Sequence, residues 1–168
     1  MDAVEVFNSL PDARLEDDLL ACCAAPAWGS AIIGKRPYAD RPALLAAADA
    51  ASLDLSWADV LAGLAAHPRI GERPVGHTQE AVWSRREQSA AAENSDDTTR
   101  SALIEANRAY EERFGHVFLI FASGRTQEEI LAAVRARLTH DATTEREIVA
   151  DQLRQIALLR LERVLDAL

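Results

Sequence analysis

The sequence predicts an all-α fold, a single compact domain over residues 1–168 built from about eight helices. Three observations support this prediction. Ala, Leu, Glu and Arg, which favour helices, dominate the chain, and aromatic residues make up only 5%. Gly and Pro, at 7 and 6 residues, are few for a β-sandwich or barrel. Apolar residues also recur at helical spacing between recognisable start and stop signals.

Periodicity and capping residues place the helices. Ser56 and Asp59 have the spacing of an N-cap and a first-turn acid, and Thr78 can cap the helix that follows it. The threonines at 126 and 144 each precede a glutamate by three residues, which predicts two capping boxes. The expected helices cover residues 12–24, 28–34, 41–51, 56–66, 79–92, 96–114, 127–138 and 145–166.

Two helices carry more detailed expectations. In 12–24 the predicted apolar stripe consists of Leu15, Leu19, Leu20 and Cys23. The helix at 79–92 is expected to be broken from the next one by Asn-Ser-Asp at 94–96.

Two segments are expected to be non-helical. Pro68 pushes His67 out of helical geometry, and prolines and glycines keep residues 67–77 as a loop. The apolar run at 117–122 has the length of a strand and lies between Gly115 and Gly124. Periodicity alone leaves its type ambiguous, and we interpret it as an extended buried segment.

Charge and cysteine content exclude several classes of protein. The chain has 27 Asp and Glu against 18 Lys and Arg, a net charge of −9, which is the wrong sign for binding nucleic acid. Cys22 and Cys23 are adjacent, so no disulfide framework is expected and a reducing compartment is the simplest interpretation. The acidic N-terminus lacks a signal-peptide core, the apolar runs are too short for a bilayer, and the C-terminus matches no peroxisomal address. We expect a cytosolic protein that does not act at membranes.

His67 is the first residue with a pattern suited to chemistry. A loop position made rigid by Pro68 suits an imidazole that transfers a proton. The alternative is that His67 only caps the C-terminus of the preceding helix. The histidines at 67, 77, 116 and 140 have no partner at metal-ligand spacing, so we expect no metal site.

The predicted helix at 79–92 brings polar side chains together. Ser84, Glu87, Gln88 and Ala91 share one helical face, which could read a ring with alternating donors and acceptors. The alternative is an ordinary solvated face, because the neighbours at 85 and 86 are arginines. Arg160 is unusual in a different way, because it interrupts an apolar helical stretch where an unpaired charge is costly to bury.

Together these residues resemble the 2-oxo-4-hydroxy-4-carboxy-5-ureidoimidazoline (OHCU) decarboxylase family. The similarity is carried by His-Pro-Arg-Ile-Gly-Glu at 67–72 and Ser-Arg-Arg-Glu-Gln at 84–88, and by the stretches at 110–122 and 156–161. Ala-Cys-Cys at 21–23, Trp28 and Arg-Pro-Tyr at 36–38 also look like bacterial members. Phe121, where members often have cysteine, and Ser89, where many have alanine, depart from the pattern and put the shape of the pocket in question.

The resemblance implies a homodimeric enzyme that needs no metal or organic cofactor and decarboxylates this ureidoimidazoline to (S)-allantoin during urate degradation. It implies that His67 is the proton donor and that Glu87 orients it or binds substrate. Arg160 would pair with Glu87 or with the leaving carboxylate. The implied substrate-binding residues are Pro68, Ser84, Arg85, Arg86, Gln88, Phe118, Leu119, Ile120, Phe121, Ala122 and Arg160.

Two other functions fit parts of the pattern. A non-enzymatic helical interaction module explains the composition equally well, but not a His-Pro loop together with a polar helix face. A relative acting on another ureide or hydantoin would keep His67 and Glu87 and differ in the pocket wall.

Overall fold

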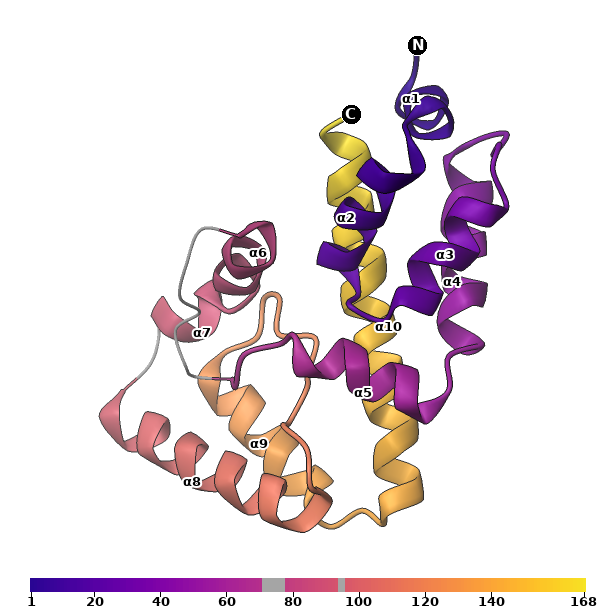
Figure 1. Cartoon of the computed structure of the whole chain (residues 1–168). Helices are drawn as coiled ribbons and strands as arrows, with labels where there is room; N and C mark the ends of the chain where they lie inside the picture. Colours follow the sequence, from indigo (N-terminus) through magenta and orange to yellow (C-terminus); the bar gives the residue numbers. More distant parts are fainter. Residues whose placement is uncertain (71–77, 94–95) are drawn as a thin grey trace. The chain divides into compact units, whose positions relative to one another are not determined.

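In the computed structural model, which describes residues 1–70, 78–93 and 96–168, every regular element is a helix (Figure 1). The all-α class is therefore confirmed. The expected loop residues at 71–77 and the expected helix break at Asn94 and Ser95 lie outside the described residues. Within the described ranges, no helix is both long and apolar enough to cross a bilayer.

The chain divides into two compact units, and the expectation of a single domain stays a prediction. Unit 1 comprises Met1–Gly63 and Leu153–Leu168, and unit 2 comprises Leu64–Gln152. Each is described by itself. Unit 1 contains α1 (Ala3–Ser9), α2 (Asp12–Cys22), α3 (Pro26–Gly34), α4 (Arg41–Leu53), most of α5 (Trp57–Ala65) and the last part of α10 (Ala142–Asp166).

Trp28 belongs to α3, which packs against both α2 and α4 (Figure 1). Its side chain is fully buried, and its indole N–H donates to the Ala48 carbonyl at 3.1 Å and to the Ser52 hydroxyl at 3.0 Å. The one polar atom of the largest buried side chain is thus satisfied, as a tryptophan in a core requires.

Close packing in unit 1 also depends on Gly63. A Cβ at this position would lie 2.9 Å from Leu153 Cδ2 and 3.5 Å from Cys23 Sγ. A larger residue would require the end of the Leu153 side chain to move, so glycine at this position allows close packing of α5 and is not needed here for its backbone freedom.

The first helices differ from the sequence prediction. α1 was not predicted, although Asp2 and Glu5 form a reciprocal capping box that starts it and its Phe7 is fully buried. α2 ends at Cys22, earlier than expected, because Cys23 has extended backbone. Leu20 is 40% exposed, so its place on the apolar stripe was wrong, and the stripe is instead made of Leu15, Leu19 and Cys22.

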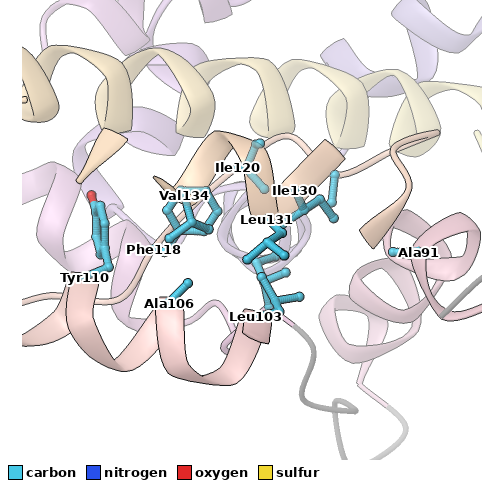
Figure 2. Packing of buried hydrophobic residues seen from close by; sticks show 11 residues of the cluster. Ala91, Leu103, Ala106, Tyr110, Phe118, Ile120, Ile130, Leu131 and Val134 are labelled. Atoms are coloured by element: carbon cyan, nitrogen blue, oxygen red, sulfur yellow. The ribbon is translucent and has the colours of Figure 1, made fainter. Parts of the chain in front are cut away.

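Unit 2 has a separate core. It contains α6 (Gln79–Glu87), α7 (Ser89–Glu93), α8 (Asp97–Phe114), α9 (Gln127–Arg137) and the first part of α10. α8 and α9 pack side by side, and the segment at 117–122 adds its apolar side chains to theirs (Figure 2). This segment is neither helix nor strand, and Phe118, Leu119, Ile120 and Ala122 are buried in it.

Two predicted boundaries in unit 2 were wrong. The helix expected at 79–92 is interrupted at Gln88, so that α6 and α7 are separate and the structure has more helices than expected. At this break the Ser89 hydroxyl donates to the Arg86 carbonyl at 2.8 Å and competes for backbone bonding. α10 begins at Ala142 rather than after Thr144, because the Asp141 carboxylate accepts the Thr144 N–H at 2.7 Å and so caps the helix.

Candidate active site

His67 follows α5 directly, as the sequence predicts. The helix ends at Ala65, and the His67 N–H donates to the Leu64 carbonyl at 3.0 Å. Both His67 and Pro68 are half-buried. The imidazole therefore sits on a short, proline-restricted segment where it is neither sealed in the core nor fully in solvent, which suits a group that exchanges a proton.

The two residues after Pro68 are held by α8. Arg69 Nε and Nη2 donate to the two carboxylate oxygens of Glu111 at 2.6 and 3.2 Å. The buried Asn107 donates from Nδ2 to the Ile70 carbonyl at 2.7 Å. A bidentate ion pair and a buried hydrogen bond thus fix the chain just after His67.

A cavity of about 300 Å³ opens beside this anchored segment. Its described lining consists of Arg69, Ile70, Ile104, Asn107, Arg108 and Glu111. Among the described residues, its lining includes none of the predicted site residues, so we do not assign it to the substrate.

The buried side of α6 carries two of the predicted polar residues. Ser84 is 3% exposed and Glu87 is 7% exposed, whereas Gln88 and Arg85 are half-buried and Arg86 is exposed. A solvated face is therefore excluded for Ser84 and Glu87. A buried carboxylate is stable only where nearby groups hydrogen-bond it or balance its charge. Buried carboxylates of this kind are enriched in functional sites.

Unit 2 brings the neighbours of these residues into one apolar cluster. Ile70 from the His67 loop, Ala91 from α7, and Phe118, Ile120 and Ala122 from the 117–122 segment belong to the same core. Figure 2 shows Ala91, Phe118 and Ile120 together with the residues of α8 and α9. The His67 loop, α7 and the apolar segment thus contribute to a common core, although they are far apart in the sequence.

The peptide groups of the 117–122 segment are only partly occupied. The Leu119 carbonyl accepts from Arg137 Nη1 at 2.7 Å, and the Phe121 N–H donates to Gln152 Oε1 at 2.8 Å. The Phe121 carbonyl accepts from Arg125 Nε at 2.9 Å. Among the described residues, the N–H and C=O of Ile120 have no hydrogen-bond partner.

A buried charged cluster supports this segment from α8, α9 and α10. Glu145, with no exposed surface, accepts from Arg137 Nε at 2.7 Å and from the Tyr110 hydroxyl. His140 Nδ1 lies 3.2 Å from its second oxygen. Burial, and then the hydrogen bond to Glu145, raise the pKa of Tyr110 far above its usual value, so this phenol stays neutral.

The sequence analysis missed Arg137, Glu145 and Gln152. A signal for two of them was present. Arg137 falls at i+7 and i+3 from the buried Ile130 and Val134, so it lies on the apolar stripe of α9. Glu145 stands four residues before the buried Val149. A charge on an apolar stripe indicates a buried pair, but the periodicity does not say which partner it meets.

Arg160 belongs to unit 1. It is 1% exposed, and its Nη1 donates to the Ala21 carbonyl at 3.1 Å. Its burial confirms that it interrupts an apolar face, while its pairing with Glu87 or with a carboxylate of the substrate stays a prediction. Over the described residues, no group of three or more His, Cys, Asp or Glu is placed to hold a metal ion.

These features define a class: an all-α protein in which one unit carries a half-buried imidazole, a buried carboxylate and hydroxyl, and peptide groups that have no partner in the described part of the chain and suit a small polar molecule. Within that class, the chain belongs to the OHCU decarboxylase family, whose profile matches residues 8–162.

Individual relatives agree with this assignment. The chain is 30% identical over 152 residues to the uric acid degradation bifunctional protein TTL of Arabidopsis thaliana, covering 89% of this chain and 47% of that protein. It therefore spans about half the length of this relative. It is 32% identical over 127 residues to the OHCU decarboxylase of Haloferax volcanii, covering 75% of this chain and 73% of that one.

A solved structure supports the fold. The crystal structure of an OHCU decarboxylase in the presence of (S)-allantoin superposes with a TM-score of 0.77 at 27% identity, covering 90% of this chain and 99% of that chain.

Proposed function

We propose that this chain decarboxylates 2-oxo-4-hydroxy-4-carboxy-5-ureidoimidazoline to (S)-allantoin in urate degradation, without a metal or organic cofactor. The observation that carries the proposal is family membership over residues 8–162. The half-buried His67 and the buried Glu87 in the same unit add to it, because the reaction needs a placed proton.

The substrate already contains the electron sink that the reaction needs. When the bond to the carboxylate breaks, its electron pair forms a double bond between the hydroxyl-bearing and ureido-bearing carbons. The C=N π electrons move onto the ring nitrogen, which takes a proton. The enol hydroxyl then loses its proton, and the ureido-bearing carbon gains one on a single face. The protein therefore has to supply orientation and a proton rather than an electron-accepting group.

His67 would deliver the proton that sets the configuration. Its position after α5 gives the imidazole a fixed backbone while keeping it half-exposed for exchange with water. Glu87, 7% exposed at the end of α6, would orient the imidazole or accept hydrogen bonds from the hydroxyl and ureido groups.

The remaining residues would hold the ring and the ureido group. We propose that Ser84 and Gln88 contribute side-chain hydrogen bonds, that Pro68 shapes the wall, and that Arg85 and Arg86 lie at the rim because they are more exposed than Ser84. Of the 118–122 backbone, the groups of Ile120 have no partner among the described residues, so they are the ones we assign to the substrate amides.

We also propose a homodimer and a cytoplasmic location. The first rests on resemblance to the family, and the second on the adjacent Cys22 and Cys23, whose spacing favours a reducing compartment. Light scattering over a range of concentrations tests the dimer, and a monomer mass throughout would refute it.

Circular dichroism tests the activity directly. The chain is added to freshly generated products of urate oxidase and hydroxyisourate hydrolase, and the appearance of optically active allantoin is compared with spontaneous decay. His67→Asn should keep the fold and lower turnover by roughly 10²–10⁴, and Glu87→Gln should act comparably. If the two residues act as one unit, the double variant is scarcely worse than either single one. Full activity in folded His67→Asn enzyme would remove this mechanism.

A further inference from the structure

Two side chains hold the peptide groups on either side of Ile120. Arg137, from the end of α9, donates to the Leu119 carbonyl, and Gln152, from α10, accepts the Phe121 N–H. Both bonds lie within unit 2, and both join the segment to helices that are distant in sequence.

Because peptide bonds are planar, these two hydrogen bonds also orient the N–H and C=O of Ile120. Among the described residues the only cis bond is Arg36–Pro37, so the bonds flanking Ile120 are trans. In a planar trans peptide the C=O of one residue and the N–H of the next point in opposite directions. Fixing the Leu119 C=O therefore aims the Ile120 N–H away from Arg137. Fixing the Phe121 N–H likewise aims the Ile120 C=O away from Gln152.

The N–H and C=O of Ile120 are therefore oriented, but within the described part of the chain neither makes a hydrogen bond. The residue is 5% exposed, and its N–H and C=O have no partner among the described residues. Buried peptide groups are almost always paired, so an unpaired donor and acceptor on one buried residue indicate a ligand that supplies the complement. A planar amide with an adjacent C=O and N–H, as in a cyclic ureide, is such a ligand.

Arg137 is itself held firmly. Its Nε bonds Glu145 at 2.7 Å, and its guanidinium lies 4.4 Å from the centre of the Phe118 ring. Glu145 is fixed in turn by the Tyr110 hydroxyl. Figure 2 shows that hydroxyl at the edge of the apolar cluster. A cation with this many contacts loses little further freedom when it orients a carbonyl.

We propose that Arg137 and Gln152 are positioning residues that orient the two peptide groups of Ile120 for a planar amide of the substrate, an inference that rests on the proposed function. Neither side chain needs to touch the substrate. The role differs from general stabilisation because it predicts a loss of ligand affinity beyond any loss of stability.

Gln152 offers the cleanest test, because it is half-buried and uncharged. Gln152→Met removes the acceptor for the Phe121 N–H at similar size, and Gln152→Glu keeps it. Gln155→Met, one turn further along α10, is the matched control. The measurements are the affinity for (S)-allantoin by calorimetry, kcat and KM for allantoin formation, and the backbone order of Ile120 and Phe121 by ¹⁵N relaxation.

We expect Gln152→Met to weaken (S)-allantoin binding and raise KM by about tenfold, with a smaller change in kcat. The order parameter of the Ile120 amide should fall from about 0.85 toward 0.6. Gln152→Glu and Gln155→Met should stay within about twofold of the parent in affinity. Unchanged affinity, KM and Ile120 order in folded Gln152→Met protein would overturn the proposal.

Substitution of Arg137 provides a second, independent test of the positioning role. Arg137→Met leaves Glu145 buried without its cation, so it can reduce stability. Arg137→Met with Glu145→Met removes both charges and should recover part of that stability. If the role is positional, the folded double variant still binds (S)-allantoin about tenfold more weakly than the parent; recovery of affinity together with stability would refute it.

A failure of the proposed function can be distinguished from a failure of the positioning role. If the unmodified chain neither forms nor binds allantoin, that function is wrong, and the order of the Ile120 amide still decides whether Gln152 positions this segment.

Discussion

Replacing Glu145 tests how much the buried cluster contributes to unit 2. Its carboxylate has no exposed surface, and it accepts from Tyr110 and Arg137 and lies beside His140. Glu145→Met removes all of these contacts at similar size. It also leaves Arg137, 6% exposed, with the Leu119 carbonyl as its remaining hydrogen-bond acceptor among the described residues.

The magnitude follows from this burial. Removing one partner of a buried ion pair costs about 3–5 kcal/mol, because the other charge is left uncompensated. For a chain of this length each kcal/mol lowers the melting temperature by about 2–4 °C. The expected decrease is therefore roughly 6–20 °C. An exposed pair such as Arg14 with Asp18 should contribute less than about 1 kcal/mol, so Asp18→Asn is the matched control.

Thermal and urea unfolding followed by circular dichroism at the helical band measure both variants. The double change Arg137→Met with Glu145→Met should cost clearly less than the sum of the single changes, because it leaves no unpaired charge. A loss under about 1 kcal/mol for Glu145→Met, or strictly additive losses in the pair, would show that the cluster is not the coupled unit that its geometry indicates.

Three further predictions concern Tyr110, the two cysteines and the independence of the reaction from metal ions. Burial raises the pKa of Tyr110, so the phenol of the folded state stays protonated where an unfolded tyrosine ionises. The stability that the neutral phenol contributes is fully present below about pH 10 and is lost above it. Tyr110→Phe should therefore lower the free energy of unfolding at neutral pH by about 1.5–3 kcal/mol and make it less dependent on pH in alkaline urea titrations. An equally steep alkaline loss in the variant would contradict this assignment. Cys22 and Cys23, at 0% and 2% exposure, should contribute packing rather than chemistry: the double change to Ala should lower the melting temperature while turnover persists, and lost turnover at an unchanged melting temperature would count against this. Allantoin formation should survive exhaustive chelation, because no metal-ligand cluster is present in the described part of the chain; activity lost with EDTA and restored by one metal would overturn the cofactor-free mechanism.

The positions of most helices could be predicted from the sequence because their signals are local. Ser56 and Asp59 cap α5 reciprocally, Gly115 ends α8 with a positive φ of 77°, and the Thr126 hydroxyl accepts the Glu129 N–H at the start of α9. Each of these contacts joins residues close together in the chain, so spacing alone reveals it. His67 and Glu87 were predicted from signals of the same local kind, a proline-restricted loop and a helical face, together with resemblance to a family, and their roles stay predictions.

The tertiary structure decided what local spacing leaves open. The start of α10 is capped by Asp141 rather than Thr144, and the Ser89 hydroxyl bonds the Arg86 carbonyl beside the break at Gln88. In both places the sequence offers more than one local hydrogen-bond acceptor, and spacing alone does not choose between them. The orientation of the peptide groups around Ile120 could not be predicted from the sequence at all. It depends on Arg137 and Gln152, which lie 18 and 31 residues from the groups that they bind. Periodicity shows that a residue faces the core, but only the folded chain selects which peptide group it meets there, because that choice depends on the packing of three helices at once.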